Sequence, residues 1–271
     1  MTSASNLHAL LLLSDSALPL GSFAFSSGLE SYLAHSKLTT SNNKTSPPNN
    51  KLHDFEQFLQ HSLSNLSSTA LPYVLAAYHS PGYEVLEGLD NDFDASTPCT
   101  VARRASLTQG RALLTVWERA LRTTTSTSTS DRQAEEASRT LTAFATALKT
   151  SKPDPLGLQL NGHFPPLFGL VCRALCLGEE ETNYLFLLSH AKAVLSAAVR
   201  AGVMGPYQSQ GVLASAKLQG WIRRCCEQRV GNVCGGNGEG VVGVEDAAVM
   251  VPMMDLWMGR HELLYSRIFN S

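Results

Sequence analysis

Apolar residues recur at steps of three and four along most of this chain, which is the spacing of one buried face of an α-helix. A clear example is the run Leu52, Phe55, Leu59, Leu63 and Leu66. No stretch of any length shows the alternation typical of strands, and no internal repeat is visible. The pattern therefore predicts an all-α fold, a single globular helical domain of about eight to ten helices with a flexible C-terminal tail.

Segments rich in small polar residues, proline or glycine divide this helical pattern. Residues 39–50 and 123–133 have the composition of exposed loops. We expect the helical domain to span residues 1–234 and the glycine-rich residues 235–243 to form a flexible hinge. The tail that follows, residues 244–271, holds four of the six methionines, whose unbranched side chains adapt to irregular surfaces.

Three local patterns give further predictions about the helices. Residues 79–98 are acidic and carry Pro81-Gly82, which indicates an irregular segment. Residues 101–121 fit one long helix, in which Gly110 would allow another segment to pack closely. Residues 208–230 fit a last long helix.

The bulk composition narrows the class of function. Charged residues make up 16% of the chain, against about 25% in typical domains, which suggests that partners cover part of the surface. The net charge is −2 without a long basic run, so nucleic acid is not an expected partner. No apolar run approaches the ~18 residues of a membrane span. No Lys or Arg precedes Lys37, which argues against a secretory or transit peptide and favours a cytoplasmic protein with reduced cysteines.

The stretch from Leu10 to Leu33 reads as a helix, a sharp knee and a second helix. Pro19 and Gly21 favour a turn after the apolar run that ends at Leu13. Ser27 and Glu30 have the spacing of a capping box, in which each side chain satisfies a free amide at the start of a helix.

Ser14, Asp15 and Ser16 in the knee also invite a nucleophile interpretation, with His35 or His163 as the histidine. Ser and Asp at a helix end more often bond to the local backbone, which we favour here. A small helical serine hydrolase using Ser14 or Ser16 is therefore the alternative function from a different class.

Two sites could hold a metal. His163 lies between Gly162 and a Phe-Pro-Pro run, and it either ties a turn to the next helix or presents a neutral imidazole to a metal. Cys172 and Cys176 lie four residues apart, as on one helical face, but buried packing is the commoner role of a free cysteine. We favour the turn for His163 and the core for the cysteines.

Several motifs resemble one family, the UreF-type urease accessory proteins. The opening stretch resembles the family signature, with Leu20 in place of Thr or Ile and Phe25 in place of a frequent His: Ser14-Asp15-Ser16-Ala17-Leu18-Pro19, Gly21, Phe23, Ser26, Gly28, Leu29 and Glu30. Four further stretches follow in order: Arg104, Ser106 and Gly110; Gly162-His163-Phe164-Pro165 with Phe168-Gly169; Ser196 to Arg200 with Gly205; and His261 to Phe269. Residues 39–50 and 123–133 look like insertions relative to the family.

The resemblance implies an all-α scaffold without enzymatic activity and without a tightly bound cofactor. Family members are homodimers that join a UreD (UreH)-type protein and the GTPase UreG, and the assembly delivers nickel in transit to apo-urease. The tail of residues 244–271 is then a docking element for the UreD-type partner. The residues expected to contact partners are Ser14, Asp15, Pro19, Phe23, Arg200, His261, Tyr265, Arg267 and Phe269. A generic helical protein-binding domain without a link to metal is the remaining alternative.

Overall fold

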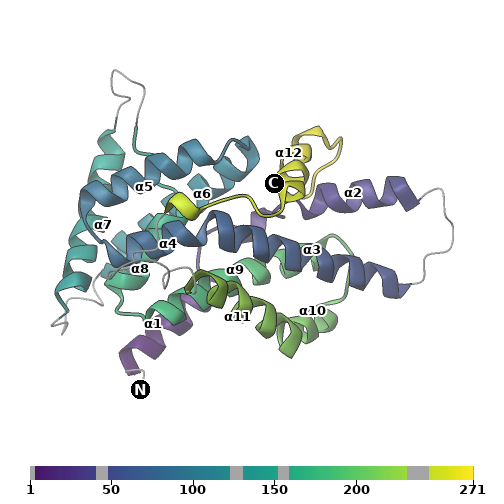
Figure 1. Cartoon of the computed structure of the whole chain (residues 1–271), viewed down its shortest axis with the longest axis horizontal. Coiled ribbons are helices and arrows are strands. Elements are labelled where there is room, and N and C mark those ends of the chain that lie inside the picture. The colour runs from purple at the N-terminus through teal and green to yellow at the C-terminus, as the bar shows by residue number, and fades with distance from the viewer. Residues whose placement is uncertain (1–3, 41–47, 123–130, 152–158, 231–243, 271) are drawn as a thin grey trace.

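The computed structural model describes residues 4–40, 48–122, 131–151, 159–230 and 244–270, and in these ranges the chain forms helices and no strand (Figure 1). The predicted all-α fold is confirmed. The α-helices are α1 (Ala4–Ser14), α2 (Leu29–Thr40), α3 (Pro48–Thr69), α4 (Leu71–His79), α5 (Tyr83–Ser96), α6 (Thr100–Val116), α7 (Arg132–Thr150), α8 (Phe164–Ala174), α9 (Glu179–Arg200), α10 (Pro206–Leu213), α11 (Ala216–Val230) and α12 (Pro252–Arg260).

Helices α4 and α8 form the centre of the core. Residues 71–78 of α4 are all buried, and α8 packs against α4, α6 and α7. The two central helices approach closely because Gly169 has no side chain: a Cβ atom there would lie 2.0 Å from the carbonyl oxygen of Val74. Helices α5, α6 and α7 gather at one end of the molecule, while α2 and α12 lie side by side towards the other (Figure 1).

The long helix predicted over residues 101–121 is confirmed, as α6 continues into a π-helical turn, Trp117–Leu121. The irregular segment predicted for residues 79–98 is wrong, because most of it is α5. Its acidic composition hid a helical face, on which Leu86, Leu89 and Phe93 are buried. Pro81 lies just outside this helix, so it does not interrupt it.

The single helix predicted over residues 208–230 is also wrong, since the structure has α10 and α11 there. The hydroxyl oxygen of Ser215 accepts the N–H of Leu218. This hydrogen bond caps the start of α11, so a new helix begins after α10 has ended at Leu213. At the first predicted loop, α2 extends to Thr40 and α3 already begins at Pro48, which a helix tolerates in its first turn. The glycine-rich residues 235–243 and most of the second loop lie outside the described residues.

The cysteine pair does not share a helix face. Cys172 lies on α8, is fully buried, and burial raises the pKa of its thiol to about 12. Cys176 follows the end of α8 with a φ of 56°. Core packing of Cys172 is therefore confirmed. None of the described helices is long and apolar enough to cross a membrane.

Candidate partner-docking surface

The knee turns because several residues adopt left-handed backbone conformations. Gly21 (φ 70°) precedes a short 3₁₀ turn, Ser22–Ala24, and Ser27 (φ 52°) and Gly28 (φ 84°) precede α2. A Cβ atom on Gly28 would lie 3.1 Å from the Cβ atom of Trp257, so the missing side chain of Gly28 also allows α12 to pack closely against the start of α2. The predicted sequence of helix, turn and helix is confirmed.

The predicted capping box is wrong, and the reason identifies a site. Ser27 is left-handed, whereas an N-cap residue takes an extended backbone. The hydroxyl oxygen of Ser26 instead accepts the N–H of Glu30 at 3.4 Å. The Glu30 carboxylate accepts the backbone N–H groups of Ile268 (2.7 Å) and Phe269 (3.2 Å), so it binds the far end of the chain.

The C-terminal segment, residues 261–270, packs against the knee through further contacts. The side chains of His261 and Phe269 are buried, and the Arg200 guanidinium lies 4.5 Å from the centroid of the Phe269 ring. The N–H of Asn270 donates to the carbonyl oxygen of Ala24 at 2.8 Å. Residues of the knee and the last residues of the chain thus form one surface.

Charge-assisted hydrogen bonds hold the outer part of this segment. Arg104 of α6 donates from Nη2 to Glu262 Oε1 at 2.6 Å and to the carbonyl oxygen of Asn270 at 2.8 Å. Arg267 donates from Nη1 to the other oxygen of Glu262 at 2.8 Å. The hydrogen bond from Arg104, and then that from Arg267, lower the pKa of the Glu262 carboxyl.

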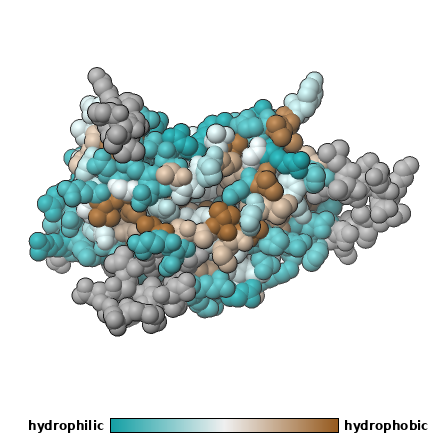
Figure 2. Space-filling view, turned by 45° about the horizontal axis from the view of Figure 1, so that its top comes forward, coloured by the Kyte–Doolittle hydropathy of each residue, from teal (hydrophilic) through white to brown (hydrophobic). Residues whose placement is uncertain are grey.

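Large apolar side chains remain exposed around this segment. They come from the knee, from α12 and from the residues on either side of α12: Phe23, Met250, Met253, Leu256, Leu263, Tyr265 and Ile268. Tyr265 is fully exposed, and Phe23 is 65% exposed. Hydrophobic patches are visible among polar residues on the face drawn in Figure 2. Exposed aromatic and apolar groups on a fixed backbone are typical of a protein-binding surface.

The structure brings most of the predicted contact residues together. Phe23, Arg200, Tyr265 and Arg267 are exposed where the C-terminal segment packs on the knee, whereas His261 and Phe269 are buried beneath this surface and hold the segment in place. The sequence interpretation missed Glu30 and Arg104, which hold the segment in place. Both residues stood in motifs of the family resemblance, and no other sequence signal pointed to this contact.

The other predicted residues are Ser14 and Asp15, which make local bonds at the end of α1, and Pro19, which lies in the turn that follows. The Ser14 hydroxyl donates to the carbonyl oxygen of Leu11, and Asp15 accepts the N–H of Ala17. Lys192 donates to the Ser14 carbonyl oxygen, and Pro19 is exposed. The bonding of Ser14 and Asp15 agrees with a capping role and gives neither residue a histidine partner among the described contacts.

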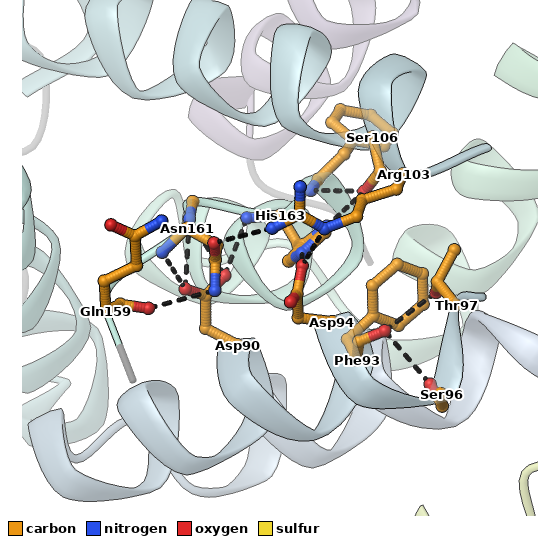
Figure 3. A network of polar contacts seen from close by, with 12 residues as sticks. Asp90, Phe93, Asp94, Ser96, Thr97, Arg103, Ser106, Gln159, Asn161 and His163 are labelled. Carbon is orange, nitrogen blue, oxygen red and sulfur yellow. Dashed lines mark hydrogen bonds and ion pairs between the residues drawn. The ribbon is translucent and has the colours of Figure 1, made fainter. Parts of the chain in front are cut away.

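A second polar cluster fixes the loop before α8 (Figure 3). The buried carboxylate of Asp90 accepts the backbone N–H groups of Asn161 (2.6 Å), Gly162 (3.0 Å) and His163 (2.7 Å). Gly110 of α6 lets the loop approach, because a Cβ atom there would lie 2.2 Å from the carbonyl oxygen of Gly162. This agrees with the close packing predicted at Gly110.

His163 is fully buried within this cluster, with both ring nitrogens engaged. Nε2 lies 2.9 Å from Asp94 Oδ1, and Nδ1 lies 3.1 Å from Ser106 Oγ. Ser106 accepts the N–H of Phe164, so its own proton is free to reach Nδ1 while Nε2–H donates to Asp94. Burial lowers the pKa of His163, which favours this neutral ring. The Asp94 carboxylate also accepts Arg103 at 2.5 Å, and although burial opposes it, the bonds from Arg103 and His163 lower the pKa of Asp94.

Ser106, His163 and Asp94 are the residue types of a hydrolase triad. In such a triad the serine lies at Nε2 and the aspartate at Nδ1, whereas here Ser106 lies at Nδ1 and Asp94 at Nε2. The Ser106 oxygen is occupied at the first turn of α8, so the chain of bonds ties α5, α6 and α8 together. Metal binding by His163 stays a prediction, and neither ring nitrogen is free for it. The described residues contain no cluster of three or more His, Cys, Asp or Glu that could hold a metal ion.

The described residues thus form a helical domain on which the last residues of the chain pack against the knee, with exposed aromatic and apolar side chains around this contact. A family model described as UreF matches residues 50–217, and the chain belongs to the UreF family. An uncharacterized urease accessory protein UreF-like of Schizosaccharomyces pombe is 36% identical over 264 residues, covering 97% of each chain. Urease accessory protein F of Arabidopsis thaliana is 28% identical, covering 95% of this chain and 89% of its own. Urease accessory protein 6 of Cryptococcus neoformans is 28% identical, covering 99% and 98%.

Proposed function

We propose that this chain is a non-catalytic scaffold for urease maturation in the cytoplasm. It bridges a UreD (UreH)-type protein and a UreG-type GTPase, so that nickel is inserted into apo-urease. The observation that carries the proposal is the surface where the C-terminal segment lies on the knee, held there by Glu30, Arg104 and Arg200. The names of the relatives supply the link to urease.

The chemistry of the surface suits a stable protein contact. Binding energy at interfaces concentrates in aromatic and arginine side chains that a partner can desolvate. Tyr265 and Phe23 are exposed aromatic groups of this kind, and Ile268 lies next to the buried Phe269. Because the backbone of the segment is already fixed by Glu30, a partner that binds it loses less conformational entropy. We assign the surface to the UreD-type partner.

In this proposal nickel is a cargo that passes through the assembly, and the chain holds no tightly bound cofactor of its own. The working unit is a homodimer, as in the family that the motifs resemble. The second partner, the GTPase, and apo-urease complete the assembly on other faces of the scaffold.

Urease activity in cells lacking this chain tests the proposal. We expect urease activity to be lost, to return with the wild-type chain, and to stay low with a Tyr265→Ala and Ile268→Asp double variant. Tyr207→Ala is the matched control, because Tyr207 is 94% exposed on α10, outside the surface. Full activity without the chain, at ordinary nickel supply, would contradict the proposed function.

Two outcomes separate the alternatives. A generic binding domain without a link to metal predicts that added nickel has no effect on urease activity in the deleted strain, whereas the scaffold predicts partial rescue. A serine hydrolase predicts turnover of small esters by the purified chain, lost in Ser14→Ala. The scaffold predicts no turnover in either form.

A further inference from the structure

We propose that the cavity between α12 and the body of the domain binds a small organic ammonium ion, held by phenylalanine rings and by the carboxylate of Asp255. The proposal concerns a ligand of this chain itself, so it does not depend on which partner binds the docking surface. It starts from the volume and the lining of the cavity.

The cavity lies where α12 packs on the rest of the domain. It has a volume of ≈ 230 Å³, and its walls come from the knee and from α3, α5, α6, α8, α9 and α12. A dry cavity of roughly 150 Å³ already holds benzene, so this one has room for an organic molecule of that size or somewhat larger. Three of the lining residues, Ser96, Pro98 and Val249, are exposed, which marks where the cavity reaches the surface.

Four phenylalanine rings from four separate parts of the chain line this cavity. They are Phe25 of the knee, Phe93 of α5, Phe164 of α8 and Phe186 of α9. The rings of Phe164 and Phe186 stack with their centroids 6.0 Å apart. Aromatic faces attract ammonium ions, most strongly where water is excluded, and the alkyl groups of such an ion fill apolar space at the same time. The rings therefore favour an alkylated ammonium ion over a hydrated inorganic one.

The cavity also contains one carboxylate, that of Asp255. Met254, Asp255 and Met258 share the inward face of α12 and all line the cavity, whereas Met253 and Leu256 are exposed. Asp255 forms no hydrogen bond or ion pair with any described residue, and burial raises the pKa of its carboxyl. A carboxylate that is partly removed from water and has no partner is costly to the fold. A cation beside Asp255 would offset this cost.

No positive charge of the described lining competes for this carboxylate. The lining contains no Lys or Arg, and its single histidine is His190 of α9. Nε2 of His190 lies 2.7 Å from Ser62 Oγ, and burial lowers the pKa of the ring to about 4, so it is neutral at pH 7. The described residues also contain no cluster of three or more His, Cys, Asp or Glu that would replace the ligands of a bare metal ion. One anionic group among aromatic rings matches an organic monocation.

The test compares choline with 3,3-dimethylbutan-1-ol, which has the same shape but carries carbon in place of the charged nitrogen. Isothermal titration of the full chain at pH 7.5 should give an affinity for choline at least tenfold higher than for the neutral alcohol. Asp255→Asn should remove this preference. Asp246→Asn is the matched control, because Asp246 is exposed and does not line the cavity, and it should keep the preference.

Cys99 gives an independent readout of where the ion binds, since it lines the cavity and is partly exposed. Choline should slow the alkylation of Cys99, measured by mass spectrometry, and leave that of Cys176 unchanged, because Cys176 lies outside the cavity. Sodium chloride at the same concentration controls for ionic strength and should protect neither thiol. In Asp255→Asn, choline should no longer protect Cys99.

Several outcomes would overturn the proposal. Equal affinity of the wild-type chain for choline and the neutral alcohol would leave an ordinary apolar cavity. Binding of choline without protection of Cys99 would place the ion elsewhere, and binding of neither choline nor tetramethylammonium would remove the site. Protection of Cys99 by nickel but by neither ammonium ion would assign the cavity to a metal. Should Asp255→Asn lose helix content, the wild-type comparison of the two probes and the protection of Cys99 decide.

Discussion

Arg104 of α6 joins two separate parts of the C-terminal segment, because its Nη2 atom donates both to Glu262 and to the carbonyl oxygen of Asn270. This single side chain connects α6 to Glu262, near the start of the C-terminal segment, and to Asn270, at its end. The docking surface therefore depends on a residue that makes no part of its apolar area.

Arg104→Ala should loosen the last residues of the chain without unfolding the domain. Hydrogen bonds to charged groups contribute roughly 1.5–3 kcal/mol, and we expect less here because Arg104 is about half exposed and solvent screens the pair. Hydrogen exchange of the Asn270 region measures the effect. Arg104→Lys should restore only part of the protection, since one ammonium cannot hold both acceptors in the same geometry. Unchanged exchange in Arg104→Ala would contradict this role.

Gly110→Ala should destabilise the whole domain. The added Cβ atom would meet the backbone of Gly162 and His163, which is itself fixed by Asp90, so the loop cannot easily move. Overpacking of this kind costs roughly 1–3 kcal/mol. Thermal unfolding is the measurement, and Gly88→Ala on the exposed side of α5 is the matched control. Its Cβ would meet nothing within 4 Å, and we expect a neutral or stabilising effect. Equal behaviour of the two variants would show that the loop yields.

Asp90→Asn should lower stability although it changes only one atom. The two carboxylate oxygens accept three backbone N–H groups, and an amide would replace one acceptor by a donor that faces them. A buried group left unsatisfied costs about 1–3 kcal/mol. Denaturant unfolding should show the loss for Asp90→Asn and little change for Asp92→Asn, which is exposed on the same helix. Little change in both variants would mean that the loop finds other acceptors.

Cys172 should resist thiol reagents in the folded chain. Its thiol is completely buried and its pKa is raised to about 12, so almost no thiolate forms at pH 8. Mass spectrometry after alkylation should find Cys99, which is partly exposed, modified well before Cys172. Denaturant should remove the difference. Rapid modification of Cys172 in the native protein would place it outside the core.

The sequence was sufficient for the helical class and for several local features. Periodicity predicted most helices, and Gly110 was correctly expected at a close approach, because such signals depend on neighbours along the chain or on a missing side chain. The acidic α5 was missed, since its charged outer face obscured the buried Leu86, Leu89 and Phe93.

The contacts that form the docking surface could not be predicted from local sequence patterns. Glu30 fits a local capping box by spacing, yet its carboxylate binds Ile268 and Phe269 at the other end of the chain. Nothing in the spacing of residues reveals a contact of that range. Motifs at the two ends could be recognised separately, but only the folded chain brings Phe23, Arg200 and Tyr265 to one surface.

The most direct test of the account is the affinity of this chain for the UreD-type partner, measured by isothermal titration with and without residues 244–271. The account predicts that the truncated chain keeps helices α1 to α11 but loses binding. It also predicts that Tyr265→Ala with Ile268→Asp weakens binding in the full chain at least tenfold while Tyr207→Ala does not. Because a tenfold change corresponds to about 1.4 kcal/mol, two such side chains suffice for it. Normal binding of the partner by the truncated chain would contradict the account.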